Sequence, residues 1–344
     1  MKFVIDRAIP FIEGVFEPYG AEVLYKDGPA IVREDLLDAD AIVIRTRTRC
    51  DASLLKGTGI KLIATATASM DNIDQEWCRE HGIYVQNASG CNAGGVTNYV
   101  FSALFGTASR KSIPLDGATF GIIGLGAAGS RVEEMALALG FKTLRYDPWR
   151  AEKESEVEFH DLDAVLAGSD VITMHIPVNA TTRGMADADF FGKMKTGAFF
   201  INTAQGELVV EQDLIDAIPR LGPVALDAWC HEPDVNRTLL DLVDIATPHI
   251  AGYTLQGKQI GTSLAIRAVA RFFSLSALYE FFPTTEILEY QAVRIDAHDK
   301  TQGQIASMIQ YNYPIFTDDF MFRMDPSRFN ELRVNYSYRR EFYF

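Results

Sequence analysis

The sequence predicts an α/β protein made of two lobes, each a doubly wound parallel sheet, followed by a small carboxyl-terminal region. Short apolar runs alternate with helical patterns along most of the chain, which is typical of parallel strands joined by crossover helices. The length of 344 residues exceeds one ordinary domain and suits two or three. A glycine-rich turn follows one apolar run directly, as at the ligand-binding edge of such sheets.

The first lobe is expected from residues 1–94. Its strands are short apolar runs bounded by turn residues: Lys2–Ile5, Glu22–Leu24, Ala41–Arg45, Lys61–Thr65 and Ile83–Gln86. Helical patterns fall between them at Phe11–Pro18, Arg33–Asp38 and Asp74–His81. A further helix-compatible stretch after Gly252 runs to about Tyr279, and we expect residues 253–283 to complete this lobe.

The second lobe is expected from residues 95–252, with a long helix at 94–108 as the bridge into it. A helix at Ser130–Leu139 follows its first strand. Its predicted strands are Thr119–Ile123, Lys142–Tyr146, Val171–His175, Ala198–Asn202, Val224–Ala228 and Ile245–Thr247.

Residues 284–344 form the predicted carboxyl-terminal region, which is rich in aromatic side chains and is expected to be irregular. Aromatic residues are enriched at subunit contacts, so we interpret this region as a dimerisation surface of a homodimer. Ordinary packing on the chain's own body is the alternative. The aromatic residues are Tyr311, Tyr313, Phe316, Phe320, Phe322, Phe329, Tyr336, Tyr338, Phe342, Tyr343 and Phe344.

The composition narrows the class of partner. The net charge is −14, and such a field repels nucleic acid and anionic membranes at long range. No run approaches the roughly 20 apolar residues of a membrane helix. The four cysteines have no metal-ligand spacing and suit free thiols in a reducing compartment. We therefore expect a cytoplasmic protein without a metal site.

The glycine-rich turn carries the pattern GxGxxG at Gly124, Gly126 and Gly129, after a strand and before a helix. Glycines there permit a tight turn and let the backbone approach a pyrophosphate at the helix N-terminus, as in a Rossmann fold. Asp147 ends the next strand, where a carboxylate accepts hydrogen bonds from the ribose hydroxyls and repels a 2′-phosphate. NAD is therefore favoured over NADP, although Arg145 and Arg150 nearby would weaken that preference.

Three further segments follow later strands: Ile201–Gly206, Asp227–Pro233 and Thr247–Tyr253. With the glycine loop, they make the whole chain resemble the D-2-hydroxyacid dehydrogenase family. The segments GCN at 90–92 and HIAGY at 249–253, together with the carboxyl-terminal extension, resemble one branch of it in particular. The resemblance implies NAD-linked oxidation of the 2-hydroxyl of 4-phosphoerythronate, a step toward pyridoxal phosphate.

The resemblance also implies roles for individual residues. His249 would take the hydroxyl proton, and Glu232 would hold the other ring nitrogen and stabilise the imidazolium. A loop-capping His249 without chemistry is the alternative, and His175 suits a structural or cofactor-lining role. Implied substrate contacts are Thr46, Thr67 and Tyr253. Implied cofactor contacts are Gly124, Gly126, Ala127, Ala128, Gly129, Asp147, Ile176, Thr203, Ala204, Asp227 and Gly252, with Asp227 facing the nicotinamide carboxamide.

The chain departs from the family pattern at three positions. Gln205 stands where the family carries a catalytic arginine that forks onto the substrate carboxylate, a geometry that no neutral side chain reproduces. Ser69 replaces a glycine of the substrate loop, and Ala127 replaces an asparagine. Either turnover is impaired, or another cation has taken over, with Arg45 nearest and Arg47 on the same strand face by period-two alternation. A solvated edge is the alternative for both arginines.

Three hypotheses about function remain open at this point. The first is an NAD-dependent dehydrogenase of a phosphorylated 2-hydroxy acid, and the second is a non-catalytic NAD-binding interaction module. A dehydrogenase of another 2-hydroxy acid is the third. Gln205 favours the module, whereas the complete Glu232–His249 pair favours an enzyme. The active site of the enzyme would lie in a cleft between the lobes.

Overall fold

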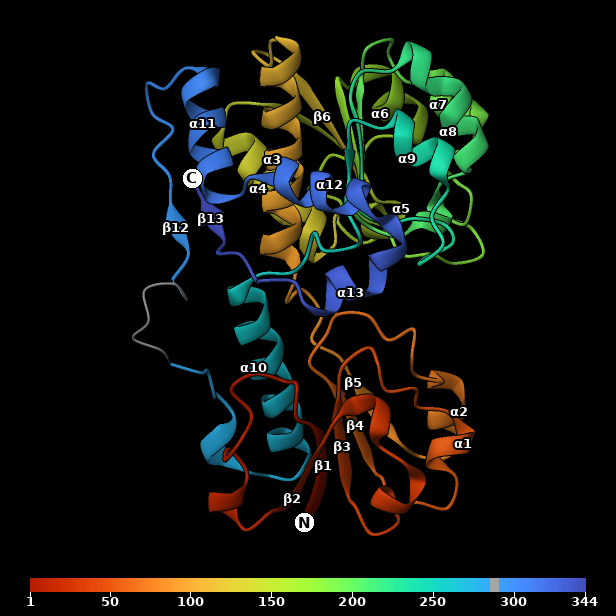
Figure 1. The fold of residues 1–344 in the computed structure, drawn as a ribbon, viewed down its shortest axis with the longest axis vertical. Helices are drawn as coiled ribbons and strands as arrows, with labels where there is room; N and C mark the ends of the chain where they lie inside the picture. Colours follow the sequence, from red (N-terminus) through yellow and green to blue (C-terminus); the bar gives the residue numbers. More distant parts are fainter. Residues whose placement is uncertain (285–290) are drawn as a thin grey trace. The chain divides into compact units, whose positions relative to one another are not determined.

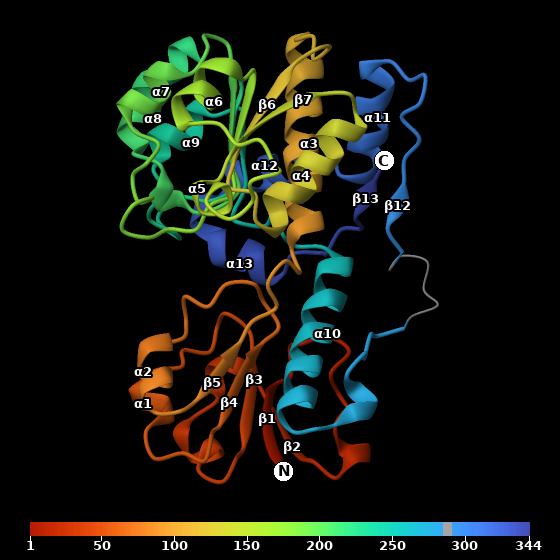
Figure 2. The same cartoon turned by 180° about the vertical axis from the view of Figure 1, so that it is seen from behind.

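The computed structural model describes residues 1–284 and 291–344, which form two compact units (Figures 1 and 2). The first unit contains Met1–Asn92 and the chain from Leu255, and the second contains Ala93–Thr254 and Gln291–Phe344. Residues 285–290, which fall in the predicted carboxyl-terminal region, lie outside the described residues. The parallel sheets confirm the predicted fold class.

The first unit is built on a five-stranded parallel sheet in the order β2-β1-β3-β4-β5. Helix α10 (Leu255–Phe272) covers one face, where Ile266 and Ala64 belong to the same hydrophobic core. Helices α1 (Ala52–Leu55) and α2 (Gln75–Glu80) cover the other face. The strands match the predictions within two residues: β1 (Lys2–Asp6), β2 (Glu22–Lys26), β3 (Ala41–Ile44), β4 (Leu62–Thr65) and β5 (Tyr84–Gln86).

Two helices predicted in the first unit were wrong. Residues 11–16 form turns and bends, followed by a 3-10 turn at Glu17–Tyr19. An α-helix cannot pass through them because Phe11 and Gly14 have φ values of 62° and 77°, outside the right-handed region. The predicted helix Arg33–Asp38 is a 3-10 turn, Arg33–Leu36. Short 3-10 turns also occur at Gly28–Ala30 and Ser276–Leu278.

The second unit is built on a six-stranded parallel sheet in the order β11-β10-β9-β8-β6-β7. The order reverses between β6 and β8, and open α/β sheets bind ligands beyond the carboxyl ends at such a point. The strands confirm the predicted positions within two residues: β6 (Thr119–Ile123), β7 (Lys142–Tyr146), β8 (Val171–Met174), β9 (Phe199–Asn202), β10 (Val224–Leu226) and β11 (Ile245–Ala246).

Helices cover both faces of this second sheet (Figure 2). On one face lie α3 (Ala93–Lys111), the predicted bridge, and α4 (Ala127–Ala138), where Phe101 stacks on Phe120. The other face buries Phe190, Phe191 and Phe200. The remaining helices of this part are α5 (Pro148–Ala151), α6 (Leu162–Gly168), α7 (Ala188–Lys193), α8 (Glu211–Ala217) and α9 (Arg237–Leu242), with 3-10 turns at Gly206–Leu208 and Ile218–Arg220.

The carboxyl-terminal segment is largely helical, so the expectation of an irregular tail was wrong. It forms α11 (Gln302–Asn312), α12 (Ile315–Met324) and α13 (Phe329–Val334), with a 3-10 turn at Pro326–Arg328. A capping box between Thr301 and Gln304 begins α11 and was the missed sequence signal. The short strands β12 (Val293–Arg294) and β13 (Phe342–Tyr343) pair with each other.

The aromatic side chains of this segment divide into two groups. Tyr313, Phe322 and Phe329 are buried in the cores of the second unit. Tyr311 and Phe320 are 87% and 60% exposed. Part of the aromatic content is therefore ordinary packing within the unit, and the dimerisation role of the exposed part stays a prediction.

Candidate active site

A carboxylate and an imidazole meet where the loops after β10 and β11 come together. Nδ1 of His249 lies 3.0 Å from Oε1 and 2.9 Å from Oε2 of Glu232. Oε1 also accepts the backbone N–H of Trp229 at 2.9 Å. A carboxylate facing Nδ1 favours the tautomer that carries its proton there, and it leaves Nε2 free to accept a proton.

The two side chains shift each other's ionisation. Burial lowers the pKa of His249, but the hydrogen bond and charge of Glu232, with the charge of Asp227, outweigh it and leave that pKa raised. Burial raises the pKa of Glu232, but the hydrogen bond and charge of His249 leave it lowered overall. Both directions favour an ion pair, which is the state that forms once His249 has taken a proton.

Asp227 holds the loop that carries His249. Its side chain is fully buried, and its two carboxylate oxygens accept the backbone N–H groups of Ile250 and Ala251, each at 2.8 Å. His249 has a φ of 56°, a left-handed conformation that a non-glycine residue rarely adopts without support. The structure therefore shows that Asp227 stabilises the loop that carries His249, and its predicted contact with the nicotinamide carboxamide stays a prediction.

The glycine loop joins β6 to α4, and each of its three glycines has a different structural environment. Gly124 has a φ of 90°, and a Cβ there would lie 2.5 Å from Cγ2 of Ile176. A Cβ on Gly129 would lie 1.9 Å from the Gly124 carbonyl oxygen, so the helix can pack closely only with glycine at that position. A Cβ on Gly126 would meet no heavy atom within 4 Å.

The start of α4 fits the pyrophosphate of a dinucleotide. Gly126 is the N-cap and supplies no side-chain cap for the helix amides, while Ala127 and Ala128 begin the helix with small side chains. The positive end of the helix dipole and these amides favour an anion. Ile176, which follows β8, lies against Gly124, so the two strands at the switch point contribute neighbouring residues.

Asp147 is fixed at the end of β7 by two backbone donors. Oδ2 accepts the N–H of Leu125 in the glycine loop at 2.9 Å, and Oδ1 accepts the N–H of Arg150 at 3.0 Å. The nearby arginines are paired with acids, since Nε of Arg145 lies 2.5 Å from Glu133 and Arg150 binds Glu154 at 2.7 Å. Paired guanidinium groups are less available to a 2′-phosphate, which agrees with NAD rather than NADP.

Gln205 lies in a turn that packs on the loop of Glu232. Asn202 organises this turn, because its Oδ1 accepts the N–H of Ala204 at 3.0 Å and its Nδ2 donates to the Gln205 carbonyl at 2.9 Å. A Cβ on Gly206 would lie 1.9 Å from the Trp229 carbonyl carbon, so the two backbones are in direct contact. The hydroxyl of Thr203 is buried and has no partner among the described residues. The predicted roles of these residues remain untested.

Thr46 and Thr67 belong to the first unit and lie just past the carboxyl ends of neighbouring strands. Thr46 follows β3 in an exposed turn, and Thr67 follows β4. The Thr67 hydroxyl lies 2.7 Å from that of Thr65. Their substrate contacts stay predictions.

Arg45 lies in a loop that is held by contacts with neighbouring residues, and it does not continue the strand. Strand β3 ends at Ile44, so the period-two alternation that placed Arg47 on the same face as Arg45 was wrong. Nε of Arg45 lies 3.6 Å from the buried carboxylate of Asp6, whereas Arg47 is exposed. Asn72 donates to the Arg45 carbonyl at 3.2 Å and holds this loop beside the segment of Ser69. Arg45 is therefore not a solvated edge residue.

The other predicted positions take clear places in the second unit. The ring of Tyr253 contacts Tyr336 and Tyr338 at centroid distances of 6.1 and 6.2 Å. Gly252 packs on Gly95, where a Cβ would lie 3.0 Å from the Gly252 carbonyl carbon. Nε2 of His175 lies 2.9 Å from the Thr173 hydroxyl, and burial lowers the pKa of His175 to about 3. His175 is therefore neutral near pH 7, and its structural or cofactor-lining role stays a prediction.

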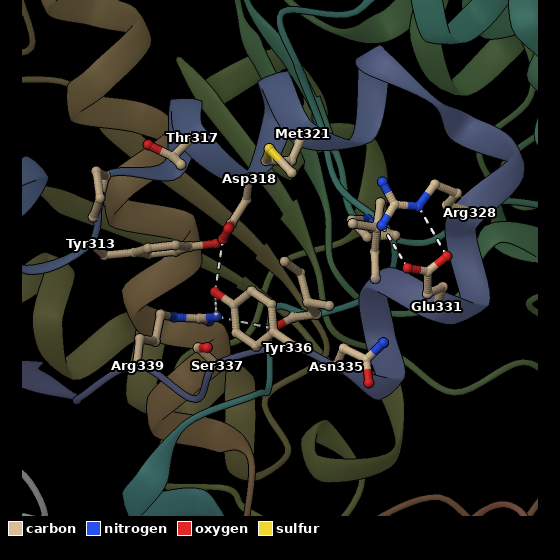
Figure 3. A pocket seen from close by; sticks show the side chains of 14 residues that line it. Tyr313, Thr317, Asp318, Met321, Arg328, Glu331, Asn335, Tyr336, Ser337 and Arg339 are labelled. Atoms are coloured by element: carbon tan, nitrogen blue, oxygen red, sulfur yellow. Dashed lines mark hydrogen bonds and ion pairs between the residues drawn. The ribbon is translucent and has the colours of Figure 1, made fainter.

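Sequence reasoning gave no role to two arginines of the carboxyl-terminal segment that reach this site. Nη1 of Arg333 lies 3.9 Å from Oε2 of Glu232, and Arg339 donates to the carbonyl oxygens of Ile250 and Ala251. A cavity of about 410 Å³ separates parts of this segment from the loop after β11 (Figure 3). The one available signal was the position of charged residues within an apolar, aromatic tail.

Two structural properties bear on the class of protein. None of the helices that the structure describes is both long and apolar enough to cross a membrane. Within residues 1–284 and 291–344, no cluster of three or more His, Cys, Asp or Glu side chains could hold a metal ion.

Comparison with known proteins assigns the chain to a family. Residues 100–251 match the model of the D-isomer specific 2-hydroxyacid dehydrogenase NAD binding domain. The chain is 39% identical to the erythronate-4-phosphate dehydrogenase of Bacteroides thetaiotaomicron, covering 99% of this chain and 97% of that one. It is 36% identical to that of Yersinia pestis (strain Pestoides F), covering 99% and 93%.

A solved structure of similar fold agrees. The NAD+-bound 3-phosphoglycerate dehydrogenase of Entamoeba histolytica matches with a TM-score of 0.68 and 26% identity, covering 83% of this chain and 99% of that one. The chain therefore belongs to the erythronate-4-phosphate dehydrogenase family, within the NAD-dependent D-isomer-specific 2-hydroxyacid dehydrogenases.

Proposed function

We propose that the protein oxidises the 2-hydroxyl of 4-phosphoerythronate to the 2-oxo acid, 2-oxo-3-hydroxy-4-phosphobutanoate, in the synthesis of pyridoxal phosphate. The observation that carries the proposal is the hydrogen-bonded pair of Glu232 and His249 in the NAD-binding unit. A protein that only bound NAD would not need this pair. The names of the two relatives supply the substrate.

The proposed chemistry assigns each group one task. NAD, when bound, supplies the acceptor for the hydride that leaves C2 of the substrate. Nε2 of His249 accepts the proton of the 2-hydroxyl, while Glu232 holds Nδ1 and stabilises the resulting imidazolium. Asp227 keeps His249 in place through the following two backbone N–H groups. Thr46, Thr67 and Tyr253 are the proposed substrate contacts.

Gln205 lacks the positive charge that the proposed reaction needs at this position. Its amide can donate two hydrogen bonds but carries no charge, so a substrate carboxylate would be left short of a cationic partner. Such a loss costs about 2–5 kcal/mol, or roughly tens-fold to thousands-fold in rate. Arg45 is the proposed substitute cation, although its contact with Asp6 at 3.6 Å already occupies part of its charge.

The test is turnover in both directions, with 4-phosphoerythronate and with its 2-oxo product, for the natural protein and for Gln205→Arg. We expect the substitution to raise kcat/KM by about two orders of magnitude. Gln212→Arg, which adds the same charge on the exposed face of α8, is the matched control and should change nothing. If neither protein turns over while both bind NADH, the dehydrogenase function fails and an NAD-binding module takes its place.

Homodimerisation and a cytoplasmic location are also proposals. Exposed apolar side chains on α12, among them Phe320 and Met324, support a subunit contact. Light scattering of the natural protein and of Phe320→Asp tests it, with a shift to monomer expected for the variant. The buried thiols of Cys50 and Cys78 suit a reducing compartment.

A further inference from the structure

The carboxyl-terminal segment Phe329–Glu341 contacts the acid–base pair from within the same unit. We propose that Arg333, on α13, is a positioning residue of the dehydrogenase reaction, whose guanidinium orients the Glu232 carboxylate toward His249. This inference rests on the proposed function, because it takes His249 as the base.

Packing of aromatic side chains brings Arg333 to this place. The ring of Trp229, in the loop of Glu232, contacts Phe322 at 6.0 Å, and Phe322 contacts Phe329 at 5.7 Å. These three rings are buried, so α12 and α13 are fixed against the loop. Residues four apart share one face of a helix, and Arg333 therefore follows Phe329 toward the same loop.

The contacts of Glu232 leave little freedom for its carboxylate. Oε1 accepts the N–H of Trp229 on one side, and Oε2 lies 3.9 Å from Nη1 of Arg333 on the other. Both oxygens also face Nδ1 of His249. The carboxylate thus has an outer partner at each oxygen, which holds it in the orientation that presents both to the imidazole.

The charges around the imidazole give Arg333 a second effect. Among the described residues, the carboxylates of Glu232 and Asp227, in the loop after β10, raise the pKa of His249, and the guanidinium of Arg333, on α13, lowers it. Two carboxylates alone stabilise the imidazolium, which cannot act as a base. The positive charge of Arg333 lowers the pKa of His249 against them and so increases the neutral fraction.

The same segment also holds the backbone next to His249. Arg339, which is 9% exposed, donates from Nη1 to the Ile250 carbonyl at 3.0 Å and from Nη2 to the Ala251 carbonyl. Asp227 binds the N–H groups of the same two residues. The Asp227 carboxylate therefore binds the N–H groups of this loop, and the Arg339 guanidinium binds its carbonyl groups.

Arg339 is itself braced from the cavity side. Figure 3 shows Tyr336 between Arg339 and Asp318, with its hydroxyl accepting from Nη1 of Arg339 at 3.1 Å and donating to Asp318 at 2.8 Å. The segment that carries Arg333 is thus anchored at both ends, by Phe329 in the core and by Arg339 on the catalytic loop.

The first test is an NMR titration of the His249 ring in the full chain, assigned with His249→Gln. Replacing Arg333 by Gln removes the charge, and we expect the pKa of His249 to rise by about half a unit to one unit. Arg333→Lys keeps the charge and should leave that pKa near its natural value. Arg328→Gln, which breaks an exposed pair with Glu331 in the same segment, is the matched control.

The second test is the pH profile of kcat/KM for oxidation with the same variants. Because only neutral His249 accepts a proton, the ascending limb of Arg333→Gln should move to higher pH by the same amount. Its plateau should fall about tenfold, with partial rescue by Arg333→Lys. A purely structural role would lower the plateau without moving the limb.

The outcomes separate this inference from the proposed function. The positioning role is overturned if Arg333→Gln and Arg328→Gln have the same His249 pKa and the same ascending limb in the pH profile of kcat/KM. A natural protein that turns over no 2-hydroxy acid overturns the proposed function instead. The NMR titration does not depend on turnover, and it then still decides whether Arg333 acts on the pair.

Discussion

Glu232 presents both carboxylate oxygens to Nδ1 of His249, at 3.0 and 2.9 Å. This approach to both oxygens favours the tautomer with its proton on Nδ1, supports a positive charge on the ring and leaves Nε2 able to accept a proton. Removing Glu232 should therefore shift the pKa of His249 in the direction opposite to the shift expected on removing Arg333.

Replacing Glu232 by Gln should lower kcat/KM by about 10²–10⁴-fold, because the amide neither fixes the tautomer nor stabilises the imidazolium. Glu232 raises the pKa of His249, so its removal lowers that pKa and moves the ascending limb of the pH profile to lower pH. A pH series of kcat/KM measures both effects. Glu331→Gln, at an exposed position, is the control, and a limb that stays in place would contradict the assignment.

The pair should also stabilise the fold within a limited pH range. The raised pKa of His249 contributes stability that is complete below its unfolded value of 6.5 and is lost as pH rises through the folded pKa. The lowered pKa of Glu232 contributes stability that is present above 4.5 and is lost as pH falls through the folded pKa. The difference in melting temperature between the natural protein and His249→Gln should therefore be largest between pH 4.5 and 6.5, with the variant less stable. A constant difference across pH 4–9 would refute this prediction.

Two glycines of the dinucleotide loop should behave differently when changed to alanine. Gly126→Ala meets no atom within 4 Å and needs no unusual φ, so the fold should keep its melting temperature. The added methyl group would face the pyrophosphate, and NADH should bind at least about tenfold more weakly. Gly124→Ala, with a φ of 90° and a methyl group 2.5 Å from Ile176, should destabilise the fold by about 1–3 kcal/mol. Melting curves and NADH titrations by fluorescence measure these effects.

Gly192→Ala is the control for this pair, because its Cβ also meets no atom and it lies on α7. It should change neither the melting temperature nor NADH affinity. Equal loss of NADH affinity in Gly126→Ala and Gly192→Ala would show that the methyl group at 126 does not approach the cofactor.

Replacing Asp147 by Ser should weaken NADH binding about tenfold, since the ribose hydroxyls lose a charged acceptor. The affinity for NADPH should fall less than the affinity for NADH, because the variant also lacks the carboxylate that repels a 2′-phosphate. The ratio of the two dissociation constants, measured by fluorescence, therefore moves toward one. Glu152→Gln removes an exposed charge from the same segment and should leave the ratio unchanged, and an unaltered ratio in Asp147→Ser would remove Asp147 from the ribose site.

Much of the fold follows from local sequence. The strands of both sheets are short apolar runs between turn residues, and their positions agree with the structure within two residues. The helix predicted at Phe11–Pro18 failed because left-handed Phe11 and Gly14 interrupt a superficially helical pattern, whereas Arg33–Asp38 forms only the 3-10 turn Arg33–Leu36. The tail was misjudged because its aromatic content masked the capping box of Thr301 and Gln304.

The residues of the candidate site divide in the same way. Gly124, Gly126, Gly129 and Asp147 could be found from spacing, because one strand, one turn and one helix place them relative to each other over about 25 residues. Glu232 and His249 were found through resemblance, and the structure then supplied their distance. Asp227 was expected at the cofactor, while its hold on the catalytic loop needed the two backbone N–H contacts to be seen.

The sequence by itself determined the two parallel sheets and the dinucleotide loop, because each is written in a local pattern or a short motif. The pair of Glu232 and His249 was expected through resemblance. Only the tertiary structure decided that Arg333 reaches Glu232 and that Arg339 reaches the backbone after His249. Their contacts join residues about 90–100 positions apart and depend on Phe322 and Phe329 packing beneath Trp229. No local propensity encodes such a contact, since it forms only when separate hydrophobic surfaces bury one another.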